Sequence, residues 1–155
     1  MKTKKKNVLL DMSCSIIHHG HVRLIKRASK YGRLIISLTL DKDLIKYKKI
    51  KPELAFKYRK EILQSVKNVY KVIPGRYILD QKFINKNKID IVVQGSDYKN
   101  RKFKNKVITF PRTIGISSSK MRKIAAKNAL KKRSLRIWVT NLGEYLFQLE
   151  FKKLY

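Results

Sequence analysis

Residues 7–28 of the chain read NVLLDMSCSIIHHGHVRLIKRA, and this stretch predicts a strand, a loop and a helix in that order. The apolar run Val8-Leu9-Leu10 is typical of a buried strand, and apolar residues recur at helical spacing after His21. All three histidines of the chain lie in the tetrapeptide His18-His19-Gly20-His21, where the helix is expected to begin. The unpaired N–H groups and positive dipole of a helix start favour anions, and imidazoles can donate hydrogen bonds to phosphate oxygens. The stretch is therefore a candidate phosphate-binding site.

Strand and helix patterns alternate along the rest of the chain. Continuous apolar runs such as Leu34–Leu40 are typical of strands that are buried on both faces of a parallel sheet. A lysine-rich loop is expected to follow this strand, through Lys51. The strands are expected at residues 7–13, 34–40, 69–73, 89–93 and 106–110, and the helices at 20–31, 54–66, around 83–84 and at 117–130. This alternation predicts an α/β fold with a doubly wound parallel sheet of about five strands, which binds ligands beyond the carboxyl ends of its strands.

The 155 residues are expected to form a single domain with a C-terminal extension. We assign residues 1–130 to the domain and residues 131–155 to the extension. Apolar and polar residues alternate in the extension around Asn141-Leu142-Gly143, which is a hairpin pattern. The pattern does not indicate what the extension does.

The chain is strongly basic, with 39 Lys and Arg residues against 10 Asp and Glu residues and a net charge of +29. Such a charge attracts polyanions, so nucleic acid and anionic membrane surfaces are both to be considered as partners. The lysines are spread along the whole chain, and the aromatic residues do not alternate with them as they do in a base-stacking platform. A basic RNA- or DNA-binding protein without enzymatic activity is therefore an alternative that the charge keeps open but does not favour.

The single cysteine, Cys14, excludes a disulfide within the chain and fits a reducing compartment. Two interpretations of this thiol are open, a small buried residue and a nucleophile. The sequence contains no run of about 20 apolar residues that could span a membrane. A cytoplasmic protein is expected.

A second segment with phosphate-binding features is Arg112-Thr113-Ile114-Gly115-Ile116-Ser117-Ser118-Ser119. Its serines lie where a helix is expected to begin, so they offer hydroxyl groups beside unpaired backbone N–H groups. The guanidinium of Arg112 can donate two parallel hydrogen bonds to one phosphate. The segment is therefore a second candidate anion-binding site, far from the histidines in sequence.

Together the two segments resemble the cytidylyltransferase family of nucleotidyltransferases. The first matches its H-x-G-H motif, and the second matches its R-T-x-G-I-S-[ST]-[ST] element, in the right order and about a hundred residues apart. The resemblance implies a Rossmann-like fold and transfer of CMP from CTP to a small phosphorylated alcohol, giving a CDP-alcohol and pyrophosphate. Glycerol 3-phosphate is the first acceptor to test. Adenylyltransferases share the H-x-G-H motif, so ATP is the alternative nucleotide.

The resemblance also implies roles for individual residues, with His19 as a bystander at the variable position of the motif. The residues implied in catalysis are His18, His21, Lys48 and Arg112. Those implied in nucleotide binding are Ser13, Cys14, Gly20, Gly95, Asp97, Thr113, Ile116, Ser117 and Ser118. Acceptor contacts are implied for Lys67 and Tyr77. No metal site in the protein is expected, Mg²⁺ is expected to arrive with CTP, and a homodimer is expected from the family.

The chain departs from the family pattern just before the histidines. The family carries G-[TS]-F-D there, and this chain carries Met12-Ser13-Cys14-Ser15. A second lysine of the family's basic loop falls on Ile50. These differences affect how the first loop contacts phosphates, and they leave the identity of the acceptor open.

Overall fold

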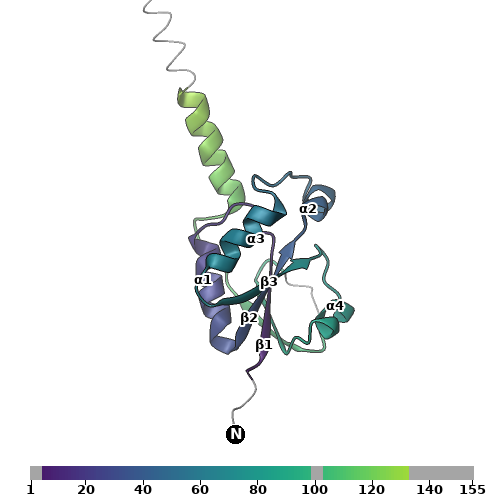
Figure 1. Ribbon diagram of the computed structural model, residues 1–155. Coiled ribbons are helices and arrows are strands. Elements are labelled where there is room, and N and C mark those ends of the chain that lie inside the picture. The colour runs from purple at the N-terminus through teal and green to yellow at the C-terminus, as the bar shows by residue number, and fades with distance from the viewer. Residues whose placement is uncertain (1–4, 99–102, 133–155) are drawn as a thin grey trace, which may run out of the picture. The chain divides into compact units, whose positions relative to one another are not determined.

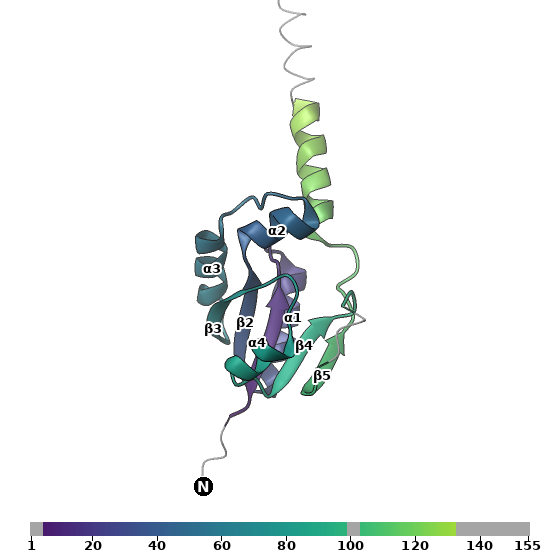
Figure 2. The same ribbon diagram turned by 90° about the vertical axis from the view of Figure 1, so that its right-hand side faces the viewer.

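The computed structural model describes residues 5–98 and 103–132. Its centre is a parallel sheet of five strands in the order β3-β2-β1-β4-β5, which Figure 2 presents side by side. The strands are β1 (Asn7–Met12), β2 (Arg33–Thr39), β3 (Val69–Gly75), β4 (Ile91–Gly95) and β5 (Lys106–Phe110). The predicted doubly wound parallel α/β sheet is confirmed.

Helices cover both faces of the sheet (Figure 1). Side chains of α1 and α3 pack on one face, and side chains of α4 pack on the other. The helices are α1 (His19–Ala28), α2 (Asp41–Lys48), α3 (Phe56–Ser65) and α4 (Gln81–Lys86), with a short 3₁₀ helix, η1 (Ser29–Tyr31), after α1. Residues 118–132 are also helical.

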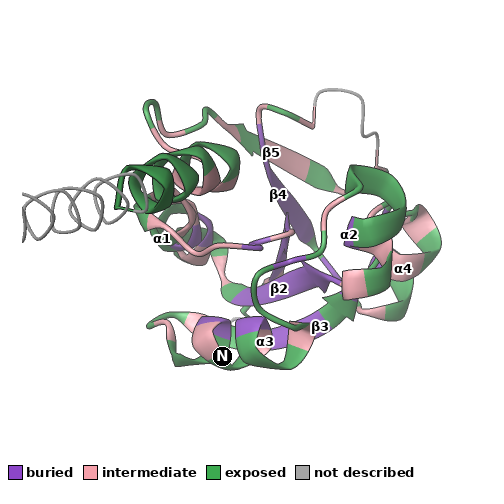
Figure 3. Ribbon diagram, turned by 90° about the horizontal axis from the view of Figure 1, so that it is seen from above, coloured by how far each residue is buried: buried purple, intermediate pink, exposed green. Residues whose placement is uncertain are grey.

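The strands are apolar on both faces because each face has its own core. In β1, Val8 and Leu10 belong to the core under α1 and α3, and Leu9, which lies between them, belongs to the core under α4. All three side chains are fully buried. Figure 3 shows the buried central strands between helices whose outer surfaces are exposed. This two-sided burial explains why the strands appear in the sequence as continuous apolar runs.

The strand order reverses at β1, and this reversal determines where a ligand can bind. The chain moves outward from β1 to β2 and β3, and then returns to the other side of β1 for β4 and β5. In an open parallel sheet the crevice at such a reversal lies beyond the carboxyl ends of the strands. Here those ends are Met12 of β1 and Gly95 of β4.

The expected lysine-rich loop after β2 is wrong, because residues 41–48 form α2. Asp41 and Asp43 lie in its first turn, and Lys46 and Lys48 lie in its last turn, so both charge types complement the helix dipole. Lys49 ends the helix in a left-handed conformation with φ of 55°. The helix carries one buried residue, Leu44, so its sequence lacked an apolar periodicity to recognise.

Strand β3 continues through Pro74 and Gly75, where the sequence predicted that it would end. Proline lacks the N–H that a central strand needs, but β3 lies at the edge of the sheet.

The chain divides into two compact units, Met1–Ser118 and Ser119–Tyr155. The boundary after residue 130 stays a prediction, and the hairpin expected in the extension lies outside the described residues. Within the described parts of the chain, no helix is long and apolar enough to cross a membrane.

Candidate functional site

The histidine tetrapeptide lies at the start of α1, directly after the loop that follows β1. His18 is the N-cap residue, with extended φ and ψ of −149° and 168°, and α1 begins at His19. The backbone N–H of His21 donates to the carbonyl oxygen of His18 at 2.9 Å. The helix therefore fixes both histidines at its positive end, at the carboxyl edge of the sheet.

The imidazoles of His18 and His21 stack with their ring centroids 3.9 Å apart and an interplanar angle of 28°. The backbone N–H of His18 donates to Nδ1 of His21 at 3.4 Å. Since Nδ1 of His21 accepts a hydrogen bond, its proton lies on Nε2, which is then a donor for an anion. His19 is exposed, and its ring centroid lies 6.3 Å from that of His18.

Both imidazoles are held neutral. Burial, followed by the charges of His18, Lys48 and Arg112, lowers the pKa of His21 to about 3. Burial, followed by the charges of His19 and Arg112, lowers the pKa of His18. Neutral rings donate hydrogen bonds to phosphate without changing protonation state near pH 7.

Nδ1 of His18 is buried and has no hydrogen-bond partner among the described residues. An unpaired buried nitrogen is costly unless a ligand or water satisfies it. The His18 side chain also faces the backbone N–H of His21 in a capping box, so this nitrogen lies at the start of α1.

The segment that follows β5 meets the histidine segment. The hydroxyl of Ser118 donates to the carbonyl oxygen of Ile16 at 3.1 Å. A Cβ on Gly20 would lie 3.2 Å from Cγ2 of Ile116. The charge of Arg112 also contributes to the lowered pKa of both His18 and His21. The two motifs that the sequence singled out therefore lie together at one edge of the sheet.

Asp97 and Arg112 connect the ends of β4 and β5. They form an ion pair at 4.0 Å, with about half of each side chain exposed. A Cβ on Gly95 would lie 2.5 Å from Oδ1 of Asp97, so glycine lets this carboxylate fold back over the end of β4. Thr113 and Ser117 lie in the segment after β5 and are partly buried.

Lys48, the last residue of α2, extends over the first loop. Its ammonium donates to the hydroxyl of Ser13 at 2.9 Å and lies 5.6 Å from the centre of the Tyr77 ring. Tyr77 stacks on Tyr47 with centroids 5.0 Å apart and an interplanar angle of 10°. Tyr77 lies two residues after β3 ends, so the structure places it at the same edge of the sheet as Lys48.

Lys67 does not lie at this edge. It belongs to the turn between α3 and β3, which precedes the amino end of β3. The histidines follow the carboxyl end of a parallel strand, and the seven residues of β3 separate the two edges by about 20 Å. The sequence predicted a helix through residue 66, directly before Lys67, but α3 ends at Ser65 and Lys67 lies in the turn that follows. An acceptor contact for Lys67 within this chain is therefore not supported.

Cys14 is buried, with 4% of its surface exposed, and it has a positive φ of 43°. Burial raises the pKa of its thiol to about 12, although the charge of Arg59 acts in the opposite direction. A thiol that stays protonated is a poor nucleophile. The interpretation of Cys14 as a small buried residue therefore holds, and only its backbone is suited to contact a nucleotide.

Sequence reasoning missed Arg59, which is 2% exposed on α3. Its guanidinium donates to the carbonyl oxygens of Ser13, Thr39 and Leu54 and to the carboxylate of Asp41. The sequence feature that could have identified Arg59 is its spacing from Leu63. Residues four positions apart lie on the same side of a helix, and Leu63 is buried.

No three His, Cys, Asp or Glu side chains lie close enough to hold a metal ion together in residues 5–98 and 103–132. The described site offers imidazole, guanidinium, ammonium and hydroxyl donors. Such a set is suited to binding an anion.

The chain is similar to several known proteins. Residues 13–124 match the family model described as cytidylyltransferase-like. The chain is 34% identical over 125 residues to a glycerol-3-phosphate cytidylyltransferase of Bacillus spizizenii, covering 76% of this chain and 95% of that relative. It is 30% identical over 92 residues to an FAD synthase of Ferroglobus placidus, covering 59% of this chain and 60% of that relative.

The fold has a counterpart among solved structures. The crystal structure of the lipopolysaccharide core biosynthesis protein from Thermoplasma volcanium GSS1 superposes with a TM-score of 0.63 and 20% identity. The match covers 71% of this chain and 99% of that chain. At 20% identity this similarity shows a shared fold and nothing further about function.

Proposed function

The chain belongs to the cytidylyltransferase-like family, and from this premise we propose that it transfers CMP from CTP to a small phosphorylated alcohol. In this reaction a phosphate oxygen of the acceptor attacks the α-phosphorus of CTP. The bond from that phosphorus to the bridging oxygen of the β-phosphate breaks, and pyrophosphate leaves with the electron pair. The product is a CDP-alcohol.

The proposal is carried by the convergence of the two motifs. Ser118 bonds to the loop that precedes His18, and the charge of Arg112 reaches the imidazoles of His18 and His21. Neutral imidazole N–H groups and a guanidinium can surround one triphosphate and stabilise the negative charge that grows at the α-phosphate during attack. Lys48 would neutralise a further phosphate from the opposite side of the loop.

The substrates are the finer part of the proposal. Glycerol 3-phosphate is the preferred acceptor, because a relative covered over 95% of its length bears that name. CTP is the preferred nucleotide, and the similarity to an FAD synthase makes ATP the alternative to test. Mg²⁺ would enter as part of the nucleotide substrate, coordinated by phosphate oxygens.

The first prediction concerns His18, whose substitution by asparagine should abolish product formation while the protein stays folded. Radiolabelled CTP or ATP is incubated with Mg²⁺ and candidate acceptors, and products are separated by chromatography. The loss should exceed about a hundredfold, in the range of a lost transition-state donor.

His19→Asn in the same tetrapeptide is the matched control and should retain wild-type activity. Circular dichroism verifies that both variants fold. Turnover of His18→Asn at the wild-type rate would contradict the assigned role. Failure of the wild-type protein with every nucleotide and acceptor would contradict the proposed reaction itself.

A further inference from the structure

A row of polar residues crosses the sheet on the face that α4 covers. The apolar core on this face includes Leu9, Ile35, Ile73, Val92 and Val107, one residue from each strand. Side chains on a strand alternate between faces, so the residues two positions further on share this face and lie nearer the carboxyl edge. They are Asp11 of β1, Ser37 of β2, Gly75 of β3, Gln94 of β4 and Thr109 of β5. We call Asp11, Ser37, Gln94 and Thr109 the polar row.

The members of the polar row are neighbours. Asp11 is in register with Ser37, and Gln94 is in register with Thr109. Leu10 is in register with Val93, so Asp11 and Gln94, the next residues along, lie on adjacent strands about 5 Å apart. The row is thus continuous across the reversal in strand order, where this fold binds ligands.

The inner members of the row are buried, although buried polar groups are stable only when they are hydrogen-bonded. Ser37 is fully buried, and Asp11 and Gln94 are each 4% exposed. The hydroxyl of Ser37 donates to Oδ1 of Asp11 at 3.1 Å. A Cβ on Gly75 would lie 2.0 Å from the Ser37 hydroxyl, so this serine fits only beside glycine.

Gln94 retains an unused acceptor atom. Its Nε2 donates to the carbonyl oxygen of Tyr98 at 3.0 Å and to the hydroxyl of Thr109 at 3.4 Å. A carbonyl oxygen can only accept, so the amide orientation is fixed by Tyr98. Oε1 of Gln94 is buried and has no hydrogen-bond partner among the described residues. Such an atom calls for a donor that a ligand or water supplies.

The polar row lies close to the carboxyl edge of the sheet, at which the proposed transfer site is also found. Asp11 precedes the end of β1 by one residue, and the next loop residue, Ser13, bonds to Lys48. Gln94 precedes Gly95, whose neighbour in space is Asp97. The row therefore connects the side of the site that holds Lys48 with the side that holds Asp97 and Arg112.

We propose that the polar row binds the hydroxyl groups of a polyol phosphate, the acceptor of the transfer, an inference that rests on the proposed function. Oε1 of Gln94 accepts a hydrogen bond, so it matches a head group that donates one. Hydroxyl groups are neutral donors. An ammonium head group would meet the positive charges of Lys48 and Arg112, which already lower the pKa of His21.

The test compares Gln94→Met, which keeps the length of the side chain and removes the acceptor atom, with Gln64→Met on the exposed surface of α3. The acceptors are glycerol 3-phosphate, 3-hydroxypropyl phosphate, which lacks the central hydroxyl, and phosphoethanolamine. Wild type and Gln64→Met should prefer glycerol 3-phosphate to 3-hydroxypropyl phosphate by about tenfold in kcat/KM, the value of one good hydrogen bond.

In Gln94→Met this preference should fall to about twofold or less, through a higher KM for glycerol 3-phosphate, while the KM for CTP stays unchanged. Calorimetric binding of CTP verifies that the variant retains the nucleotide site. If Gln94→Met does not fold, Asp11→Asn provides the second variant, and the preference of the wild type between the acceptors remains a test by itself.

Three outcomes overturn the inference. The first is an undiminished preference in the folded variant, the second is equal use of glycerol 3-phosphate and 3-hydroxypropyl phosphate by the wild type, and the third is a preference for phosphoethanolamine. In each of them the wild type still forms a nucleotide–alcohol product, so the proposed function survives. If the wild type forms no product with any acceptor, the proposed function and this inference fail together.

Discussion

The imidazole of His21 serves the fold and the proposed chemistry through different nitrogens. Nδ1 accepts the backbone N–H of His18, which helps to satisfy the start of α1. This bond leaves the proton on Nε2, the nitrogen available to a phosphate. Burial and the surrounding positive charges keep the ring neutral. One side chain thus connects helix capping with anion binding.

The lowered pKa of His21 predicts how stability depends on pH. The pKa of His21 is about 3 in the folded protein and near 6.5 in the unfolded chain. Between these two pH values the unfolded chain therefore binds a proton that the folded protein does not bind. Stability should therefore fall as pH drops from 6.5 towards 3. Between pH 7 and pH 5 the free energy of unfolding should fall by about 2 kcal/mol more in wild type than in His21→Asn.

Chemical denaturation at the two pH values measures this difference. Asparagine at position 21 retains an acceptor for the His18 N–H, so the variant should stay folded and lose activity. His19→Asn should keep more of the wild-type pH dependence than His21→Asn does, because the charge of His19 acts on His18 and the buried ring of His21 remains. An unchanged pH dependence in His21→Asn would show that the ring is not the group responsible.

At the scale of elements, Arg59 connects three segments that carry the site. From α3 it bonds to the carbonyl oxygens at the ends of β1 and β2 and to Asp41 at the start of α2. The other carboxylate oxygen of Asp41 accepts the backbone N–H of Phe56 at 2.9 Å. Arg59 and Lys48 therefore hold Ser13 by its carbonyl and its hydroxyl respectively.

Replacing Arg59 by methionine should destabilise the protein by about 2 kcal/mol, because buried carbonyl groups and Asp41 lose their donor. We give a low value for the loss of the Arg59–Asp41 ion pair, because a third of the Asp41 side chain is exposed and solvent screens the interaction. Denaturant unfolding measures the change. In the folded fraction, the KM for CTP should rise, since the loop that carries Ser13 and the helix that carries Lys48 lose a common anchor.

Arg23→Met on the exposed surface of α1 is the matched control and should leave both quantities unchanged. Arg59→Lys keeps the positive charge but has fewer hydrogen-bond donors. Its stability and its KM for CTP should therefore lie between those of the wild type and those of Arg59→Met. Equal unfolding midpoints for Arg59→Met and Arg23→Met would refute the assigned role of Arg59.

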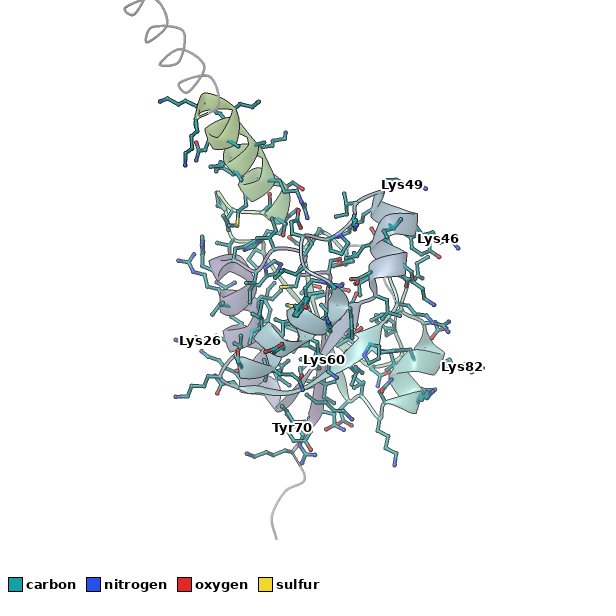
Figure 4. The ribbon with its side chains drawn as sticks, turned by 45° about the horizontal axis from the view of Figure 1, so that its top comes forward. Lys26, Lys46, Lys49, Lys60, Tyr70 and Lys82 are labelled. Atoms are coloured by element: carbon teal, nitrogen blue, oxygen red, sulfur yellow. The ribbon has the colours of Figure 1, made fainter. Side chains whose placement is uncertain are left out.

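At the scale of the whole molecule, the positive charge is distributed over separate elements. Lys26 of α1 lies on one side of the molecule, and Lys46 of α2 and Lys82 of α4 lie on the other (Figure 4). A distributed field raises the encounter rate with any polyanion, including a nucleoside triphosphate, without forming one nucleic-acid track. The homodimer expected from the family resemblance stays a prediction that light scattering can test.

Salt dependence distinguishes the two uses of this charge. Between about 50 and 200 mM salt, CTP affinity should fall less than tenfold, since short hydrogen bonds hold the phosphates, whereas protein contacts to many nucleic-acid phosphates lose about 10³-fold or more. Calorimetry with CTP and gel shift with RNA measure the two responses. RNA binding that is tight at 50 mM salt, weakens by about 10³-fold or more at 200 mM salt and is not displaced by CTP would favour the nucleic-acid alternative.

The apolar runs predicted the strands well, because burial on both faces favours an apolar side chain at nearly every position of a central strand. Val8, Leu9 and Leu10 are one example, and residues 106–110 form β5 as expected. The helix α2 was missed because it has a single buried residue, Leu44, and one apolar position does not produce a helical periodicity in the sequence. The role of Lys67 could not be judged from the resemblance, because a matching position in the chain does not tell at which end of the sheet the residue lies.

The sequence by itself determined the parallel α/β sheet and the two segments with phosphate-binding chemistry, since periodicity and local motifs are properties of neighbouring residues. Only the tertiary structure decided that these segments meet, that Arg59 is buried among carbonyl groups and that Asp11, Ser37, Gln94 and Thr109 lie in one row. These features join residues distant in the chain. Their energies depend on burial and distance, which exist only after the strands have paired.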